Sequence, residues 1–328
     1  MPEACGMTRW DVVIAGAGPA GCSAALVLGR ARRTVMLCDT GTPRSWAARE
    51  MHAYLSRDGI APARFREIAR AEALKYPGVR FQPEEVSTAR RNAAGFAVTL
   101  AGGKTLQTRK LLIATGLFDI VPRIAGIDAL FGRSVFQCPY CDGWETRDKA
   151  VAVYGRGQRG FQMARAMTAW TGDIVLLTDG RTTLRAEDRR QLDRNGIRIE
   201  RRKIAKLRGS RGKLRAIEFV DGTELAREAL FFDTPSNAQS DLARSVGCKF
   251  DRHGSVLCGA YEATSVPGVF VAGNITGDVQ LSIVAAADGA RAAFGINRAL
   301  TREDFERRAT GTRRIHHPRV RTSSAGRR

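Results

Sequence analysis

The fold of this chain is decided by a stretch near its start, residues 10–21, which reads WDVVIAGAGPAG. A short apolar run leads directly into glycines with the spacing GxGxxG, and small and apolar residues then recur at helical spacing as far as Arg30. A strand, a tight turn and a helix in this order are typical of a dinucleotide-binding unit. Gly16 permits the sharp turn, Gly18 lets the backbone approach a pyrophosphate, and Gly21 allows the helix to pack closely.

The sequence that follows supports a cofactor site at this turn. Residues 35–39 predict a second strand that ends in an acid, close to the distance expected for a carboxylate that binds a ribose. Residues 110–116 predict a buried strand whose end should face the same cofactor, because open parallel sheets bind ligands at the carboxyl ends of their strands. Beyond the fingerprint glycines, the expected contacts are Pro19 and Ala20 at the helix start, Asp39, Thr115 and Gly116.

A second, less regular copy of the motif follows an apolar run at residues 149–154 and precedes a predicted helix at 161–170. Its glycines are Gly155, Gly157 and Gly160. Asp179 lies just past the next predicted strand, where a carboxylate accepts the ribose hydroxyls of NADH and repels the 2′-phosphate of NADPH. Arg156 or Arg181 could offset that repulsion. The pattern favours a nicotinamide site without choosing between NADH and NADPH, and the alternative is a fold kept only for its architecture.

Between the two motifs, residues 138–145 read CPYCDGWE. Cysteines at CxxC spacing, here Cys138 and Cys141, can store two electrons as a disulfide, and one thiol can help to stabilise its neighbour's thiolate. Asp142 could donate and accept the proton when thiolates form and leave, or it could be an ordinary turn residue before Gly143. A CxxC can also be half of a zinc site, but the sequence has no second CxxC to complete one, so we expect no metal.

The order of the motifs predicts the domain organisation. A chain of 328 residues is long enough for two hydrophobic cores. We expect an α/β protein with two Rossmann-like, three-layer domains, the second inserted into the first. A final strand at 266–274 and an alanine-rich helix at 283–300 should complete the first domain. The predicted boundaries are 1–117 and 248–302 for the first domain, 118–247 for the second, which carries the CxxC, and 303–328 for a basic, disordered tail.

Bulk properties narrow the function classes. The chain has no apolar run of membrane-spanning length and no targeting pattern at its start, so we expect a cytoplasmic protein without membrane partners. The formal charge of +20 would attract polyanions, but no nucleic-acid motif accompanies it and aromatic residues are sparse, so nucleic-acid binding is not expected. Cys22 and Cys38 fall in predicted core elements, so we interpret both as small, buried hydrophobic residues. For His52 the sequence leaves two alternatives, a functional residue or an ordinary one.

Together these residues resemble the low-molecular-weight thioredoxin reductases and the wider thioredoxin reductase-like flavoproteins of the pyridine nucleotide-disulfide oxidoreductase family. The likeness covers about residues 8–300, and its closing motif is Ala272-Gly273-Asn274. The resemblance implies a homodimer in which Cys141 faces a flavin and Cys138 attacks a partner disulfide. It also implies FAD in the first domain, touching Gly16, Gly18, Gly21, Asp39, Gly116, Asn274 and Gln280, with Gly273 beside them.

The implied activity passes electrons from NADH or NADPH through FAD and the Cys138-Cys141 disulfide to a thioredoxin-like protein or a small-molecule disulfide. The chain departs from the family pattern at Asp179, within a stretch where NADPH-dependent members carry His-Arg-Arg, at Asn274, where an aspartate is usual, and at Leu281, where a second glutamine is frequent. Two alternatives remain. One is an FAD-dependent dithiol oxidase that closes a small-molecule disulfide with oxygen as acceptor, and the other is a basic flavin redox sensor that binds an acidic partner.

Overall fold

The computed structural model describes residues 9–180 and 182–309 and divides into two compact units. The first unit consists of the described parts of Met1–Thr42, Arg66–Gly116 and Ala238–Arg328, and the second of Pro43–Phe65 and Leu117–Asn237. The chain therefore leaves the first unit and returns to complete it. The stretch Pro43–Phe65, which the sequence boundaries assign to the first domain, packs with the second unit.

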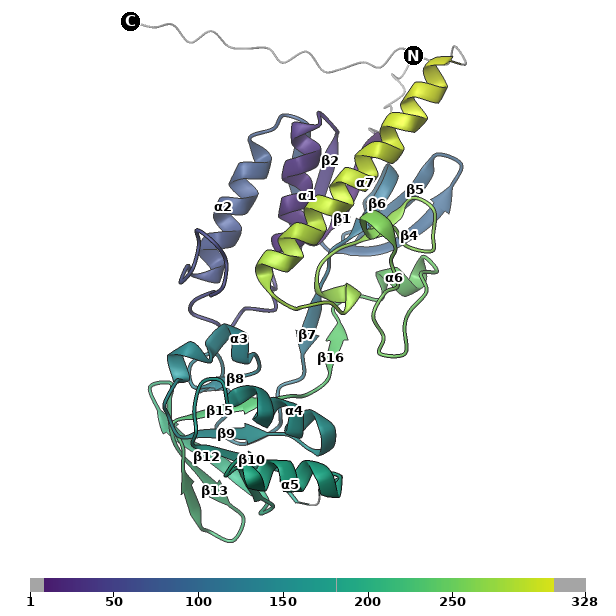
Figure 1. Cartoon of the computed structure of the whole chain (residues 1–328). Helices are drawn as coiled ribbons and strands as arrows, with labels where there is room; N and C mark the ends of the chain where they lie inside the picture. Colours follow the sequence, from purple (N-terminus) through teal and green to yellow (C-terminus); the bar gives the residue numbers. More distant parts are fainter. Residues whose placement is uncertain (1–8, 181, 310–328) are drawn as a thin grey trace, which may run out of the picture. The chain divides into compact units, whose positions relative to one another are not determined.

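Both units are built from α and β elements, labelled in Figure 1. The strands are β1 (Arg9–Ala15), β2 (Val35–Cys38), β3 (Val79–Gln82), β4 (Val86–Asn92), β5 (Gly95–Leu100), β6 (Thr105–Ile113), β7 (Leu117–Asp119), β8 (Val135–Phe136), β9 (Val151–Tyr154), β10 (Ile174–Leu177), β11 (Arg198–Glu200), β12 (Ile204–Ser210), β13 (Lys213–Phe219), β14 (Glu224–Ala226), β15 (Ala229–Phe232), β16 (Ser236–Ala238) and β17 (Val269–Val271). The helices are α1 (Pro19–Arg30), α2 (Pro62–Leu74), α3 (Pro139–Asp142), α4 (Gly157–Met167), α5 (Ala186–Arg194), α6 (Leu242–Ser245) and α7 (Ser282–Ala309), with short 3₁₀ turns η1 (Trp144–Thr146), η2 (Ala260–Glu262) and η3 (Asn274–Thr276).

The sheet of the first unit has the strand order β3-β2-β1-β6-β5-β4, and β17 adds to β6 in parallel. The strand near the end of the chain thus completes the first sheet, as the sequence predicts. Alternate residues of β1 serve opposite faces of the sheet: Val12 and Ile14 pack with α1 and α7, whereas Val13 and Ala15 pack on the face that α6 covers. Both faces are buried, which explains the unbroken apolar run that precedes the first fingerprint.

The second unit repeats this three-layer plan. Its parallel sheet has the order β11-β10-β9-β15-β8. Val151 and Val153 of β9 pack on the face covered by α4 and α5, and Ala152 packs on the opposite face. The antiparallel strands β12, β13 and β14 cover that opposite face. The expected α/β fold, with one dinucleotide-binding unit inserted into another, is confirmed.

The end of the described chain differs from the sequence prediction. Helix α7 continues to Ala309, so residues 303–309 are helical and do not belong to a disordered tail. Charge pairing explains the extension: the largely buried guanidinium of Arg109 lies 2.9 Å from a Glu303 oxygen and 2.7 Å from an Asp304 oxygen, and Arg33 lies 2.6 Å from Asp304. Residues 310–328, the rest of the predicted tail, lie outside the described residues.

Two further sequence predictions can be compared directly with the structure. Cys22 and Cys38 are buried without a disulfide, and burial raises the pKa of each thiol to about 12, which confirms them as core residues. Within residues 9–180 and 182–309, none of the helices combines the length and the apolar character that crossing a bilayer requires.

Candidate active site

The first fingerprint forms a tight turn between β1 and α1. Gly16 has a φ of 104°, and a Cβ atom on it would lie 2.3 Å from the carbonyl oxygen of Ala114. A Cβ on Gly21 would lie 1.8 Å from the carbonyl oxygen of Gly16, so only glycine lets α1 start this close to the sheet. A Cβ on Gly18 would meet nothing within 4 Å. The first turn of α1, which opens with Pro19, therefore has room in front of it for a phosphate group.

Polar groups at the ends of two neighbouring strands adjoin this turn. Asp39, after β2, accepts hydrogen bonds from the backbone N–H groups of Ala17 at 3.1 Å and Gly41 at 3.2 Å, and its carboxylate has spare acceptor sites for ribose hydroxyls. Thr115, after β6, has its backbone nitrogen beside Gly16, and its buried hydroxyl has no hydrogen-bond partner within the described chain. Buried polar atoms are normally paired, so this hydroxyl fits a site that a bound cofactor completes.

The returning part of the chain meets the same turn. Gly273, with a φ of 79°, precedes Asn274 in η3, and a Cβ on Gly273 would lie 3.2 Å from the side chain of Ala20. A Cβ on Gly289 of α7 would lie 2.0 Å from the carbonyl oxygen of Ala20, so α7 crosses α1 in direct backbone contact (Figure 1). The packing brings the predicted contacts Gly273 and Asn274 to the first turn of α1, while Gln280 follows in the loop before α7. These residues fit FAD.

The second fingerprint has the same local construction. Helix α4 begins at Gly157, which has a φ of 57°, and a Cβ on Gly155 would lie 2.7 Å from the Cα atom of Gly160. The close approach of the first and last glycines is the packing that the motif requires between strand and helix. The backbone of a dinucleotide site is therefore present in the second unit.

The ribose end of that second site is partly occupied by the chain itself. One oxygen of Asp179 accepts a hydrogen bond from the backbone N–H of Ile204 at 2.9 Å, and the other lies 3.1 Å from the Arg156 guanidinium. Arg156 also donates to the carbonyl oxygens of Thr178, at 2.9 Å, and Asp179, at 2.7 Å. The carboxylate that should bind ribose hydroxyls thus already holds two donors, although the arginine side chain is more than half exposed and can turn away.

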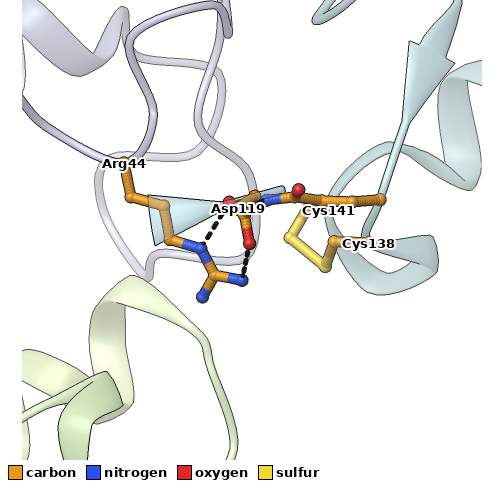
Figure 2. The surroundings of a disulfide bond; sticks show 5 residues. Arg44, Asp119, Cys138 and Cys141 are labelled. Atoms are coloured by element: carbon orange, nitrogen blue, oxygen red, sulfur yellow. Dashed lines mark hydrogen bonds and ion pairs between the residues drawn. A yellow bond between two sulfur atoms is a disulfide. The ribbon is translucent and has the colours of Figure 1, made fainter. Parts of the chain in front are cut away.

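The CxxC motif is oxidised. Cys138 and Cys141 form a disulfide across the first turn of α3, with their Cα atoms 5.2 Å apart. Figure 2 shows this disulfide beside the ion pair of Arg44 and Asp119. The exposed aromatic side chain of Tyr140 stands within the motif and packs edge-on against the Trp170 ring at 5.4 Å. A two-electron store is therefore present in the second unit, as the spacing predicts.

Asp142 follows the disulfide directly and has an unusual environment. Burial raises the pKa of its carboxyl group from 3.8 to about 7, the neighbouring Glu145 carboxylate contributes to the rise, and His52 opposes it. A group with this pKa is partly protonated at neutral pH and can both give and take a proton. This environment differs from that of a solvated turn aspartate, and the acid–base role of Asp142 stays a prediction.

Several neighbours of the disulfide have no signal in the sequence. Asp119 accepts hydrogen bonds from Arg44 and from Gln137, the residue before Cys138. Arg44 is 75 positions away from Asp119 in the chain, and no local motif marks either residue. Such contacts between residues far apart in the chain exist because Pro43–Phe65 folds as part of the second unit.

The sequence profile of the pyridine nucleotide-disulphide oxidoreductases matches residues 10–289. The chain belongs to this family. Thioredoxin reductase tcpT of Claviceps purpurea is 33% identical over 275 residues, which cover 80% of this chain and 86% of that protein. Among solved structures, HlmI is 35% identical with a TM-score of 0.88, covering 92% of this chain and 96% of that one. Thioredoxin reductase from Streptococcus pyogenes, at 21% identity, 90% and 99% coverage and a TM-score of 0.84, shows likeness of fold alone.

Membership of this family establishes a coarse function. The chain is a thioredoxin reductase-like, FAD-dependent disulfide oxidoreductase, and the cofactors of the family are FAD and NAD(P)H. The residues around the first fingerprint fit FAD, and the second unit carries the Cys138–Cys141 disulfide.

Proposed function

We propose that this protein passes electrons from NAD(P)H, through FAD and the Cys138–Cys141 disulfide, to a disulfide in a small protein or small molecule. The observation that carries the proposal is the pairing of the oxidised CxxC with a carboxyl group whose pKa is raised to about 7. A structural disulfide needs no proton donor beside it, whereas a disulfide that opens and closes in each cycle does.

The first fingerprint, Asp39, Thr115 and Asn274 would hold FAD, and Gly157 with Asp179 would hold the nicotinamide cofactor. When bound, FAD would supply the two-electron chemistry, between nicotinamide and disulfide, that side chains lack.

The reduced cysteines then act as a dithiol. The thiolate of Cys138 attacks one sulfur of the substrate disulfide, a mixed disulfide forms, and the leaving thiolate takes a proton from Asp142. The Asp142 carboxylate then takes the proton of the Cys141 thiol, and the Cys141 sulfur attacks the sulfur of Cys138. This restores the disulfide and releases the second substrate thiolate, which takes that proton from Asp142. Over the cycle the substrate gains two electrons and two protons, and Asp142 must be reprotonated.

Anaerobic mixing tests the proposal. We expect the flavin absorbance of the purified holoprotein to bleach on addition of NADH or NADPH, and a generic disulfide substrate, 5,5′-dithiobis(2-nitrobenzoate), to restore it. In the Cys138→Ser variant, the nicotinamide should still bleach the flavin, but disulfide turnover should stop. Unchanged turnover in that variant would remove Cys138 from the mechanism.

A second candidate function rests on the nicotinamide site. Because Asp179 already binds the Arg156 guanidinium and the Ile204 amide, a ribose would have to displace the arginine side chain, which favours a dithiol oxidase that needs no nicotinamide. In that case the disulfide would take electrons from a small-molecule dithiol, and oxygen would be the final acceptor. Bleaching of the flavin by dithiothreitol but by neither nicotinamide, with recovery in air, would decide for the oxidase.

A homodimer and a cytoplasmic location stay predictions.

A further inference from the structure

A segment distant in sequence contributes to the surroundings of the disulfide. Pro43–Phe65 belongs to the second unit, where Arg44 forms a two-pronged ion pair with Asp119. The Trp46 ring packs on Phe131 with the centroids 5.7 Å apart. These contacts hold the segment beside the element that carries Cys138 and Cys141, as Figure 2 shows for Arg44.

Within this segment, a short closed loop presents His52. Met51 and Ile60 form a β-bridge that closes the loop, with a backbone hydrogen bond of 2.9 Å. Inside it, Ala53 has a φ of 58° and donates its backbone N–H to Asp58 at 2.8 Å. A non-glycine residue in the left-handed region persists only where surrounding contacts define it, so the loop has a fixed conformation.

The His52 imidazole has carboxylates around it. Its Nε2 atom lies 3.5 Å from Glu50 and 3.6 Å from Glu145, and its Nδ1 atom lies 3.6 Å from Asp58. The side chain is 20% exposed, so one edge of the ring reaches solvent. Glu145 stands in η1, directly after the α3 turn that ends at Asp142, and both His52 and Glu145 act electrostatically on Asp142. The imidazole thus has one edge at the solvent and one nitrogen near Glu145, and histidine side chains commonly act as proton shuttles.

We propose that His52 and Glu145 form a proton relay that recharges Asp142 from solvent, with both acting as positioning residues for the proton that Asp142 transfers. The inference rests on the disulfide reduction proposed above. When Asp142 has given its proton to a leaving thiolate, the His52 imidazolium returns one, and the neutral imidazole regains a proton from water at its exposed edge. The Nε2 atom of His52, 3.6 Å from Glu145, links the exposed edge of the imidazole to the turn that carries Asp142.

The relay makes a prediction that distinguishes it from simple packing. The charged groups around His52 are Glu50, Asp58 and Glu145, and those acting on Asp142 are Glu145 and His52. Because Glu145 disfavours the Asp142 carboxylate and His52 favours it, neutralising each should move the Asp142 titration in opposite directions.

The first test measures that titration directly on oxidised holoprotein labelled with ¹³C at the aspartate carboxyl groups, with Asp142→Asn assigning the signal. We expect His52→Asn to raise the midpoint by about half a pH unit or more, and Glu145→Gln to lower it by a similar amount. His253→Asn, which alters an exposed histidine in a turn of the first unit, is the matched control and should leave the midpoint unchanged. Midpoints that coincide in all variants, or shift in the same direction for both, overturn the relay.

The second test measures proton delivery during turnover. Reduced enzyme is mixed with bis(2-hydroxyethyl) disulfide, whose alkyl thiolate leaving group takes up a proton on release, between pH 6 and 9, a range wide enough to bracket the pKa of about 7. We expect His52→Asn to lose about tenfold in rate and to recover part of it when imidazole is added to the buffer. Full activity without imidazole overturns the relay. Absence of turnover in the wild-type protein overturns the proposed reductase instead, so the two failures are distinct.

Discussion

Replacing Asp142 with asparagine should make the oxidised protein more stable while it slows the enzyme. Burial raises the pKa of this carboxyl group from 3.8 to about 7 in the folded protein, so folding disfavours its charged form. This destabilisation of the folded state is absent below the pKa that Asp142 has in the unfolded chain, because the group is then protonated in both states. It grows as the pH rises from about 4 to 7 and is constant above. A shift of this size corresponds to about 4 kcal/mol at pH 8, since each unit is worth about 1.4 kcal/mol.

Urea unfolding of the oxidised holoprotein at pH 4.5 and pH 8, followed by tryptophan fluorescence, measures this effect. At pH 8 we expect the urea midpoint of Asp142→Asn to lie clearly above that of the wild type, by a free-energy difference of about 4 kcal/mol. At pH 4.5 the two midpoints should approach each other. The matched control is Asp148→Asn, an exposed aspartate of the same unit, which should change neither midpoint. A stability gain that is equal at both pH values, or no gain at all, would refute burial as the cause of the raised pKa.

Three further predictions follow from contacts in the two units. Gly21→Ala should yield protein that has lost most of its flavin absorbance, because the new Cβ would lie 1.8 Å from a backbone oxygen, whereas Gly172→Ala, where nothing lies within 4 Å, should keep it. Arg156→Ala should free the Asp179 carboxylate and lower the KM for NADH relative to NADPH in steady-state assays; an unchanged ratio would contradict the blocking role of this arginine. Glu303→Gln should destabilise the protein by about 1–2 kcal/mol in urea titrations at pH 7, with the difference vanishing as the pH falls through the lowered pKa of Glu303.

The sequence alone determined the features that are local. Both GxGxxG turns, with their strand before and helix after, lie within short stretches, and their glycines are fixed by steric limits that hold in any context. The CxxC pair is equally local, because three positions of separation bring the two Cα atoms to disulfide distance within one helical turn. The order of these motifs was sufficient to predict two units with one inserted into the other.

The tertiary structure decided the chemistry of the residues around them. Asp142 reads as either a catalytic acid or a turn residue in the sequence, and only its burial beside Glu145 and His52 raises its pKa. The packing of Pro43–Phe65 with the second unit likewise became visible only through long-range contacts such as that of Arg44 with Asp119. The physical reason is that desolvation and Coulomb interactions depend on which groups lie within a few ångströms in space, and neighbours in the chain do not specify those groups.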